Sequence, residues 1–152
     1  MNEEGISIVY QAGMLHDIGK IGIEESILNK PGKLTKEEYE IVKTHVELSI
    51  GIIRHLPSLD YVIPAVIGHH ERYDGKGYPR GIKGEEVPLM ARILCVADSF
   101  DAMVSRRSYK PKMEVDCALE ILEKEAGAQF DPKLVPVFVR IVKDGTVKIR
   151  QD

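Results

Sequence analysis

Leu15-His16-Asp17-Ile18-Gly19-Lys20 closes an apolar segment that begins at Ile6. A neutral imidazole beside a carboxylate offers one nitrogen and one oxygen donor, a pair that suits a divalent ion such as iron, manganese or zinc. The same pair also occurs without a metal, as a buried His hydrogen-bonded to an Asp at a helix end. The metal interpretation is favoured by further residues in segments of predicted helix: His45, His69, His70 and Asp98.

Length and composition are those of one ordinary domain. A chain of 152 residues can bury a core without disulfides. Its formal net charge of −3 argues against a broad basic face for nucleic acid polymers, so any phosphate must be held locally. Cys95 and Cys117 lack metal-type spacing and are expected to be reduced thiols, which fits the cytoplasm. No apolar run approaches the roughly 20 residues of a membrane span, and residues 1–5 lack the basic start of a secretory signal.

Hydrophobic spacing predicts an all-α chain forming a single domain over residues 1–152. The first helix covers residues 6–16, and glycines and a proline mark residues 19–32 as a connector with one helical turn near residues 24–28. The tail after residue 146 alternates weakly and is too short to build a sheet. No internal repeat is visible.

A long helix is predicted from the capping box of Thr35 and Glu38 to about His55. Its inward stripe recurs at steps of three and four residues: Tyr39, Val42, Val46, Ile50 and Ile53. His45 lies beside this stripe and can therefore face the interior. It is either a metal ligand or a packed core histidine.

Pro57 ends this region, and Asp60 is predicted to cap a helix that carries Pro64 in its first turn and ends near His70. The turn-forming residues of the segment 74–79 then predict a shaped loop. The paired histidines stand at the mouth of that loop.

A strong helix from Pro88 to about Ser105 carries Asp98 on an apolar face. Burying an unpaired carboxylate costs several kcal/mol, so Asp98 needs a cation, a hydrogen-bond donor or a metal. Asp101 on the same helix either orients a neighbouring ligand or is a solvated charge.

Two more helices are predicted. The first covers about residues 115–126, and the second runs to about residue 143, with Asp131 as its cap and Pro132 as its first residue. Basic residues precede them, at the end of the helix that carries Asp98: Arg106, Arg107 and Lys110. Such a cluster either contacts phosphate or compensates the helix dipole.

The chain resembles the HD-GYP group of the HD superfamily in four motifs. These are His-Asp-Ile-Gly-Lys at 16–20, His45, His-His-Glu-Arg at 69–72 with Asp-Gly-Lys-Gly-Tyr-Pro at 74–79, and Val-Ala-Asp-Ser-Phe-Asp-Ala at 96–102. Order, spacing and loop all match, from about residue 12 to 139. The resemblance implies an HD-superfamily helical bundle that hydrolyses the bacterial second messenger cyclic di-GMP to pGpG or GMP.

The resemblance also implies a centre of two or three divalent ions, iron or manganese. The residues that match the family's ligands are His16, Asp17, His45, His69, His70 and Asp98. Asp17 would bridge two ions, and Lys20 matches a lysine near the scissile phosphate. Tyr78 lies in the Gly-Tyr-Pro loop, as a residue expected to contact substrate. Arg107 and Lys110 match basic positions that contact phosphates.

The chain departs from the family pattern in three places. The family carries a further ligand region with a His well before the His-Asp pair, whereas the fifteen residues before His16 contain no His. Either the chain is a fragment of a longer protein, or a neighbouring copy covers the site, or the centre is degenerate. Val46 and Ser49 stand where the family usually has Pro and Gly, which a helix tolerates. Arg106-Arg107-Ser108 replaces the usual Asp-Arg-Pro, so the phosphate contacts match less well than the ligands.

Two alternatives to a cyclic di-GMP phosphodiesterase remain open. One is a catalytically weak or inactive HD-GYP module that binds cyclic di-GMP or docks a GGDEF-type diguanylate cyclase through residues 75–84. The other is an HD hydrolase for another phosphoester. The expected partners are thus cyclic di-GMP, a GGDEF-domain protein and a second copy of the chain, without a nucleic acid polymer or a membrane.

Overall fold

A computed structural model describes residues 1–105 and 113–147. In these two ranges the chain forms eight α-helices, three 3-10 helices and no strand, apart from one isolated bridge between Ala126 and Phe130. This confirms the all-α prediction. None of these helices is both long enough and apolar enough to cross a lipid bilayer.

The N-terminal part follows the predicted pattern closely. α1 spans Glu3–Leu15 and starts at Asn2, whose side chain accepts a hydrogen bond from the Gly5 amide at 3.0 Å. η1 (Ile18–Gly22) and α2 (Glu25–Leu28) then form the connector. α1 therefore begins three residues before the predicted start, because Asn2 caps it.

The predicted helix from Thr35 to His55 consists of two helices, α3 (Lys36–Lys43) and α4 (His45–Ile53). The capping box of Thr35 and Glu38 is present as expected. The break lies at Thr44, whose amide and hydroxyl both donate to the Ile41 carbonyl and tighten the turn.

The inward stripe of this region is confirmed for α4 only. Val46, Ile50 and Ile53 are fully buried, whereas Val42 is partly buried and Tyr39 is 48% exposed. The prediction was wrong for Tyr39, which lies in α3, before the break at Thr44.

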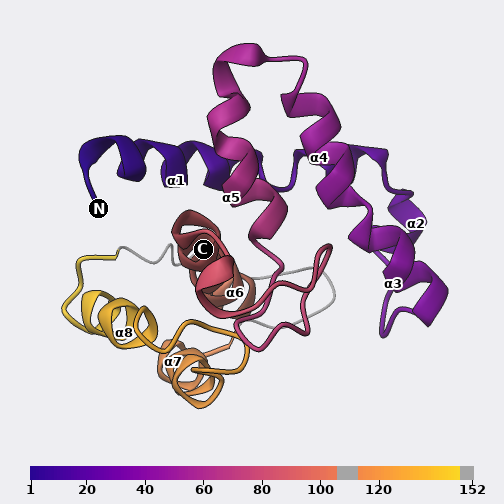
Figure 1. Cartoon of the computed structure of the whole chain (residues 1–152). Coiled ribbons are helices and arrows are strands. Elements are labelled where there is room, and N and C mark those ends of the chain that lie inside the picture. Colours follow the sequence, from indigo (N-terminus) through magenta and orange to yellow (C-terminus); the bar gives the residue numbers. More distant parts are fainter. Residues whose placement is uncertain (106–112, 148–152) are drawn as a thin grey trace.

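The next part of the chain runs through η2 (Pro57–Val62), α5 (Ile63–Gly68), η3 (Gly84–Glu86) and α6 (Leu89–Val104). Asp60 does not cap α5, because it lies inside η2, which continues directly into that helix. Figure 1 shows α4 and α5 side by side, joined by η2, with α6 near the centre of the molecule.

The last two helices are α7 (Val115–Lys124) and α8 (Val135–Lys143). Asp131 was expected to cap α8 with Pro132 as its first residue; α8 begins only at Val135, and Asp131 caps the turn that leads into it. Its side chain is buried, pairs with Arg92 of α6 and accepts a hydrogen bond from the Lys133 amide at 2.8 Å. Pro136 takes the place in the first turn that was predicted for Pro132.

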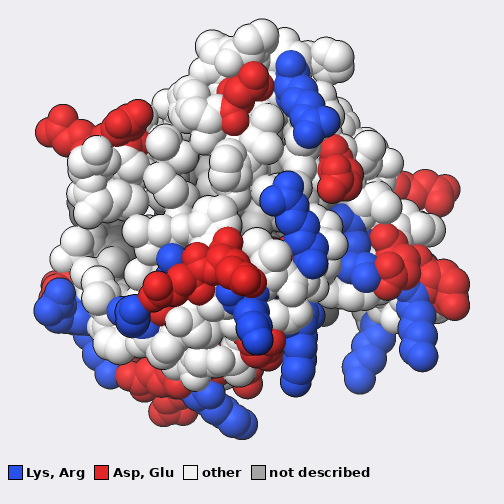
Figure 2. Space-filling view, in the orientation of Figure 1, with Lys and Arg blue, Asp and Glu red and all other residues white. Residues whose placement is uncertain are grey.

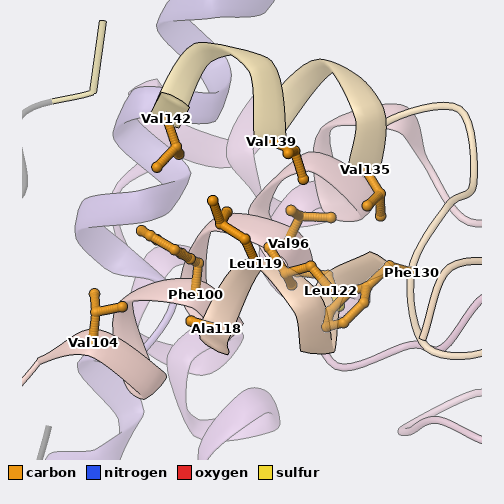
Figure 3. Close-up of a cluster of buried hydrophobic side chains, with 11 residues drawn as sticks. Val96, Phe100, Val104, Ala118, Leu119, Leu122, Phe130, Val135, Val139 and Val142 are labelled. Carbon is orange, nitrogen blue, oxygen red and sulfur yellow. The ribbon is translucent and has the colours of Figure 1, made fainter. Parts of the chain in front are cut away.

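Two apolar clusters form the core, and α6 contributes to both. One joins α6 to α7 and α8, and its facing side chains appear in Figure 3: Val96, Phe100, Leu119, Leu122, Val135 and Val139. The other joins α1, α4, α5 and η2, with Leu94 from α6. On the surface, Figure 2 shows acidic and basic side chains mixed across one face, in keeping with the small net charge.

Candidate metal centre

Four separate segments bring the six predicted ligand residues together. They are His16 and Asp17 after α1, His45 at the start of α4, His69 and His70 after α5, and Asp98 in α6. The ring centroids of His69 lie 3.9 Å from His70, 4.9 Å from His16 and 5.8 Å from His45. His69 is thus at the centre of the histidine cluster.

Three of the histidines are oriented in the same way. Each Nδ1 lies at hydrogen-bond distance from the backbone carbonyl three residues earlier: His16 with Gly13 at 2.8 Å, His45 with Val42 at 2.6 Å and His69 with Val66 at 2.6 Å. A carbonyl oxygen only accepts, so Nδ1 must carry the proton. The lone pair of each neutral ring is then on Nε2, the nitrogen that faces the cluster.

The two carboxylate oxygens of Asp17 face different neighbours. Oδ1 lies 3.4 Å from Nε2 of His45, while Oδ2 lies 3.5 Å from Nε2 of His16 and 2.5 Å from Nζ of Lys20. A carboxylate with its oxygens directed to two sides can serve two ions at once. Asp17 could therefore offer one oxygen toward His45 and the other toward His16 if ions were bound on both sides.

Several buried polar atoms of this cluster have no hydrogen-bond partner in the described part of the chain. They include Nε2 of His16, Nε2 of His69 and Oδ1 of Asp17. Leaving a buried acceptor unpaired costs about 1–3 kcal/mol, and these three atoms point into one place. An electron-pair acceptor at that place would satisfy all of them.

The donor atoms form two groups that could each hold an ion. One group is His45, His69 and His70, and the other is His16, Asp17 and His69, with the ligand atoms of each group within 4.8 Å of one another. Nitrogen donors with carboxylate oxygens suit divalent transition metals. The cluster can therefore bind metal, with His69 common to both groups.

The charge states of the donors suit the same role. Burial lowers the pKa of His69 to about 4 and that of His70 to about 2, with the neighbouring histidines adding to the effect. Burial also lowers the pKa of His45. These rings are neutral at pH 7, as metal ligands must be.

Among the described residues, His16 and Asp98 form a further charged contact of the cluster, besides those of Asp17. Nε2 of His16 lies 3.4 Å from Oδ1 of Asp98. Burial lowers the pKa of His16, but the nearby Asp98 carboxylate and the charge of Asp17 outweigh it and raise the pKa. Burial raises the pKa of Asp98, and His16 more than reverses this, to about 2. The two carboxylates thus favour the charged form of the His16 ring.

Gly19 and Ser49 explain how the His16-Asp17 turn comes so close to His45. The Ser49 hydroxyl, fully buried in α4, donates to the His16 carbonyl at 2.9 Å and accepts from the Gly19 amide at 2.8 Å. A Cβ atom on Gly19 would lie 2.1 Å from the His45 carbonyl oxygen. Only glycine permits this approach, so η1 rests directly on α4.

The other predicted site residues lie around the cluster. Lys20 is 36% exposed at its edge, and the Tyr78 ring stacks on His70 with centroids 4.8 Å apart and planes 23° apart. Burial raises the pKa of Tyr78, so its hydroxyl stays protonated. Asp101 is exposed and accepts a hydrogen bond from Ser105 at 2.9 Å, as expected of a solvated charge. Arg106, Arg107 and Lys110 lie outside the described residues.

Sequence reasoning missed three residues near His70 and Tyr78: Lys43, Tyr39 and Glu71. Nζ of Lys43 lies 5.4 Å from the Tyr39 ring and 5.6 Å from the Tyr78 ring, and these two rings meet edge to face at 6.3 Å. Glu71 is buried, and its Oε1 accepts a hydrogen bond from the Arg80 amide at 2.7 Å. The spacing of Tyr39 and Lys43 indicated a helical pair, but nothing in the sequence indicated their contact with Tyr78.

Both cysteines are free: Cys95 is buried and Cys117 is exposed. This agrees with the expectation of two unpaired thiols. Burial raises the pKa of Cys95 to about 12, so this thiol stays protonated and behaves as a core side chain.

Comparisons with known proteins agree with the geometry. The HD domain family model matches residues 1–134. A cyclic di-GMP phosphodiesterase of Thermotoga maritima is 43% identical over the whole chain, and a cyclic di-GMP phosphodiesterase response regulator of Xanthomonas campestris is 44% identical over 92% of it. The chain spans 42% and 38% of the lengths of these two relatives.

A solved structure supports the fold. The crystal structure of a cyclic GMP-AMP specific phosphodiesterase of Vibrio cholerae matches 96% of the chain with a TM-score of 0.70, at 22% identity and over 40% of that protein's own chain. The helical order, the gathered histidines and aspartates and the family match lead to one conclusion. The chain belongs to the HD-domain family, as a member of its HD-GYP group.

Proposed function

We propose that the chain is the metal-dependent phosphodiesterase part of a protein that hydrolyses a cyclic dinucleotide, with cyclic di-GMP as the first candidate. The observation that carries the proposal is the convergence of three unpartnered atoms, Nε2 of His16, Nε2 of His69 and Oδ1 of Asp17, on one place. The names of the relatives support the substrate class, since they act on cyclic di-GMP or on 3'3'-cGAMP. A cytoplasmic second messenger also fits the cytoplasmic location expected from the sequence.

The proposed centre holds two ions, iron or manganese. The single Nε2 lone pair of His69 can serve only one of them, and the remaining histidines and Asp17 supply donors for the other. A phosphodiester resists attack since its negative charge repels a nucleophile. Two divalent ions bound close together supply positive charge for the phosphoryl oxygens and make a bound water more acidic. Neutral histidines leave most of that positive charge uncompensated, which favours an anionic substrate.

The residues of the chain have distinct proposed roles around this centre. Asp17 bridges the two donor groups through its two oxygens. Lys20 holds Asp17 and places a positive charge at the exposed edge, where a phosphate would enter. Tyr78, Arg107 and Lys110 are proposed to contact the substrate, the two basic residues through its phosphates.

The test is turnover by the purified chain after loading with Mn²⁺ or Fe²⁺ under anaerobic conditions. Cyclic di-GMP and 3'3'-cGAMP are supplied in parallel, and pGpG and GMP are separated by chromatography. We expect hydrolysis that is lost in His69→Ala and retained in Lys76→Ala, a loop lysine whose side chain is exposed. Absence of hydrolysis of both nucleotides by a chain with bound metal would reject the proposal.

The binding-only alternative gives a different result in the same experiment. A module that only senses the nucleotide binds cyclic di-GMP in a titration without turning it over. A GGDEF-domain partner or a second copy of the chain remains a proposal, to be tested by co-purification and by light scattering.

A further inference from the structure

His70 differs from the other three clustered histidines in the way its ring is held. The rings of His16, His45 and His69 each have an Nδ1 hydrogen bond to a carbonyl of the preceding turn. The described hydrogen bonds include none of this kind for His70, whose ring contact is with Nε2 of His45 at 3.3 Å. Something else must set the orientation of this ring.

Tyr78 contacts His70 twice. Its ring stacks on the imidazole with centroids 4.8 Å apart and an interplanar angle of 23°. Its backbone amide donates to the His70 carbonyl at 3.2 Å. Tyr78 therefore restrains both the main chain and the side chain of the same residue.

The Tyr78 ring is itself held in place from its other sides. Tyr39 meets it edge to face, with centroids 6.3 Å apart, and Nζ of Lys43 lies 5.6 Å from its centroid. The ring is also packed against the apolar cluster of α1, α4 and α5. An aromatic ring enclosed in this way has little freedom to leave His70.

The loop that carries Tyr78 is anchored on both sides of it. A Cβ atom on Gly77 would lie 2.3 Å from the Arg72 amide nitrogen and 2.5 Å from the His70 carbonyl oxygen, so the chain touches itself there. On the other side, the buried Oε1 of Glu71 accepts from the Arg80 amide at 2.7 Å. The loop is thus held against residues 70–72 on both sides of Tyr78.

We propose that Tyr78 is a positioning residue for the metal ligand His70, and that its ring replaces the carbonyl that orients each of the other three histidines. The proposal rests on the metal centre proposed above. It assigns the Gly-Tyr-Pro loop a role in the site before any nucleotide arrives. A residue that only contacts substrate would leave the metal site unchanged when substituted.

The test compares Tyr78→Phe with Tyr78→Leu. Mn²⁺ binding is measured by calorimetry without nucleotide. Phenylalanine keeps the stacked ring and loses only the hydroxyl, so we expect wild-type affinity. Leucine removes the ring, and we expect about a 10- to 100-fold weaker affinity, the usual cost of losing a residue that orients a metal ligand. Wild-type affinity in Tyr78→Leu would overturn the proposal.

Tyr39→Leu is the matched control, because it removes a neighbouring ring of the same size that contacts Tyr78 but makes no ring contact with His70 among the described pairs. It should keep more of the Mn²⁺ affinity than Tyr78→Leu does. Equal losses in the two variants would count against a specific role for the stack.

A second measurement does not depend on how well the leucine variant folds. In the metal-free wild type and in Tyr78→Phe, the ring protons of His70 should resonate upfield of those of the other clustered histidines, because they lie over an aromatic face. Ordinary shifts for His70 in both proteins would overturn the proposal. Neither experiment uses turnover, so a chain that binds Mn²⁺ as expected but hydrolyses nothing would reject the proposed function and leave this inference intact.

Discussion

Replacing Ser49 with alanine should weaken both the fold and the metal site. The substitution removes a fully buried hydroxyl that links η1 to α4 through the His16 carbonyl and the Gly19 amide. It leaves the surrounding volume almost unchanged. The effect therefore reports the two hydrogen bonds rather than a cavity.

The expected magnitude follows from the two groups that lose their partner. A buried donor or acceptor without a partner costs about 1–3 kcal/mol. For the Gly19 amide and the His16 carbonyl together we expect a loss of about 2–6 kcal/mol in the free energy of unfolding. Because η1 then shifts relative to α4, Asp17 moves away from His45 and Mn²⁺ affinity should fall as well.

Urea unfolding of the metal-free chain measures the loss of stability. Calorimetry with Mn²⁺ measures the loss of metal affinity. Ser99→Ala is the control for loss of a hydroxyl, since the bond from Gln129 to Ser99 is long, at 3.4 Å, and partly exposed. Leu122→Ala is the control for lost stability, because it should cost about 2–5 kcal/mol in the cluster of α7 and α8. Leu122→Ala should leave Mn²⁺ affinity unchanged in the folded protein.

Two results would refute this reasoning. If Ser49→Ala loses no more stability than Ser99→Ala, the hydroxyl does not link the two elements. If Ser49→Ala and Leu122→Ala lower Mn²⁺ affinity equally, the affinity follows overall stability and not the placement of the turn.

Three further predictions concern the cluster and the loop beside it. His69→Ala and His70→Ala should each lower the amount of metal bound per chain, because each removes one ligand nitrogen, and elemental analysis would measure this; an unchanged metal content in both variants would contradict it. Lys20→Ala should lower kcat/KM for the cyclic dinucleotide about 10- to 100-fold with metal content unchanged, since it removes one charged contact to a phosphate; an unchanged kcat/KM in steady-state assays would exclude that contact. The Arg72 hydrogen bond lowers the pKa of Asp74 to about 2, so the pair stabilises the fold above pH 4 and its contribution is lost as the pH falls toward 2. Thermal unfolding between pH 5 and pH 2 should therefore show a smaller loss in Asp74→Asn than in the wild type, and parallel curves would contradict it.

The sequence predicted the parts of the fold that depend on neighbouring residues. The capping box of Thr35 and Glu38 and the helical order of the chain follow from local patterns, and the structure contains both. The six ligand candidates were found because their motifs resemble a family. Their convergence adds information that no single motif carries.

The misses come from contacts between distant parts of the chain. Asp60 looks like a helix cap in sequence but lies inside η2, and the pairing of Asp131 with Arg92 joins residues 39 positions apart. Ser49 reads as an ordinary helical residue, although its hydroxyl holds the His16-Asp17 turn. The stack of Tyr78 on His70 depends on the path of a whole loop. Local propensity cannot anticipate such pairings.

The rings of His16, His45 and His69 are each held by a carbonyl in the last turn of a helix, α1, α3 or α5. The directions of these three rings therefore depend on how well the helix ends stay folded. Terminal turns are the first parts of a helix to open, because their backbone groups lack a full set of partners. On warming, the orientations of these three imidazole rings should therefore become less well defined before the helical bundle unfolds. Substitutions that stabilise or destabilise those three helix ends, without changing any ligand residue, would change the ratio of the affinities of the site for ions of different preferred geometry.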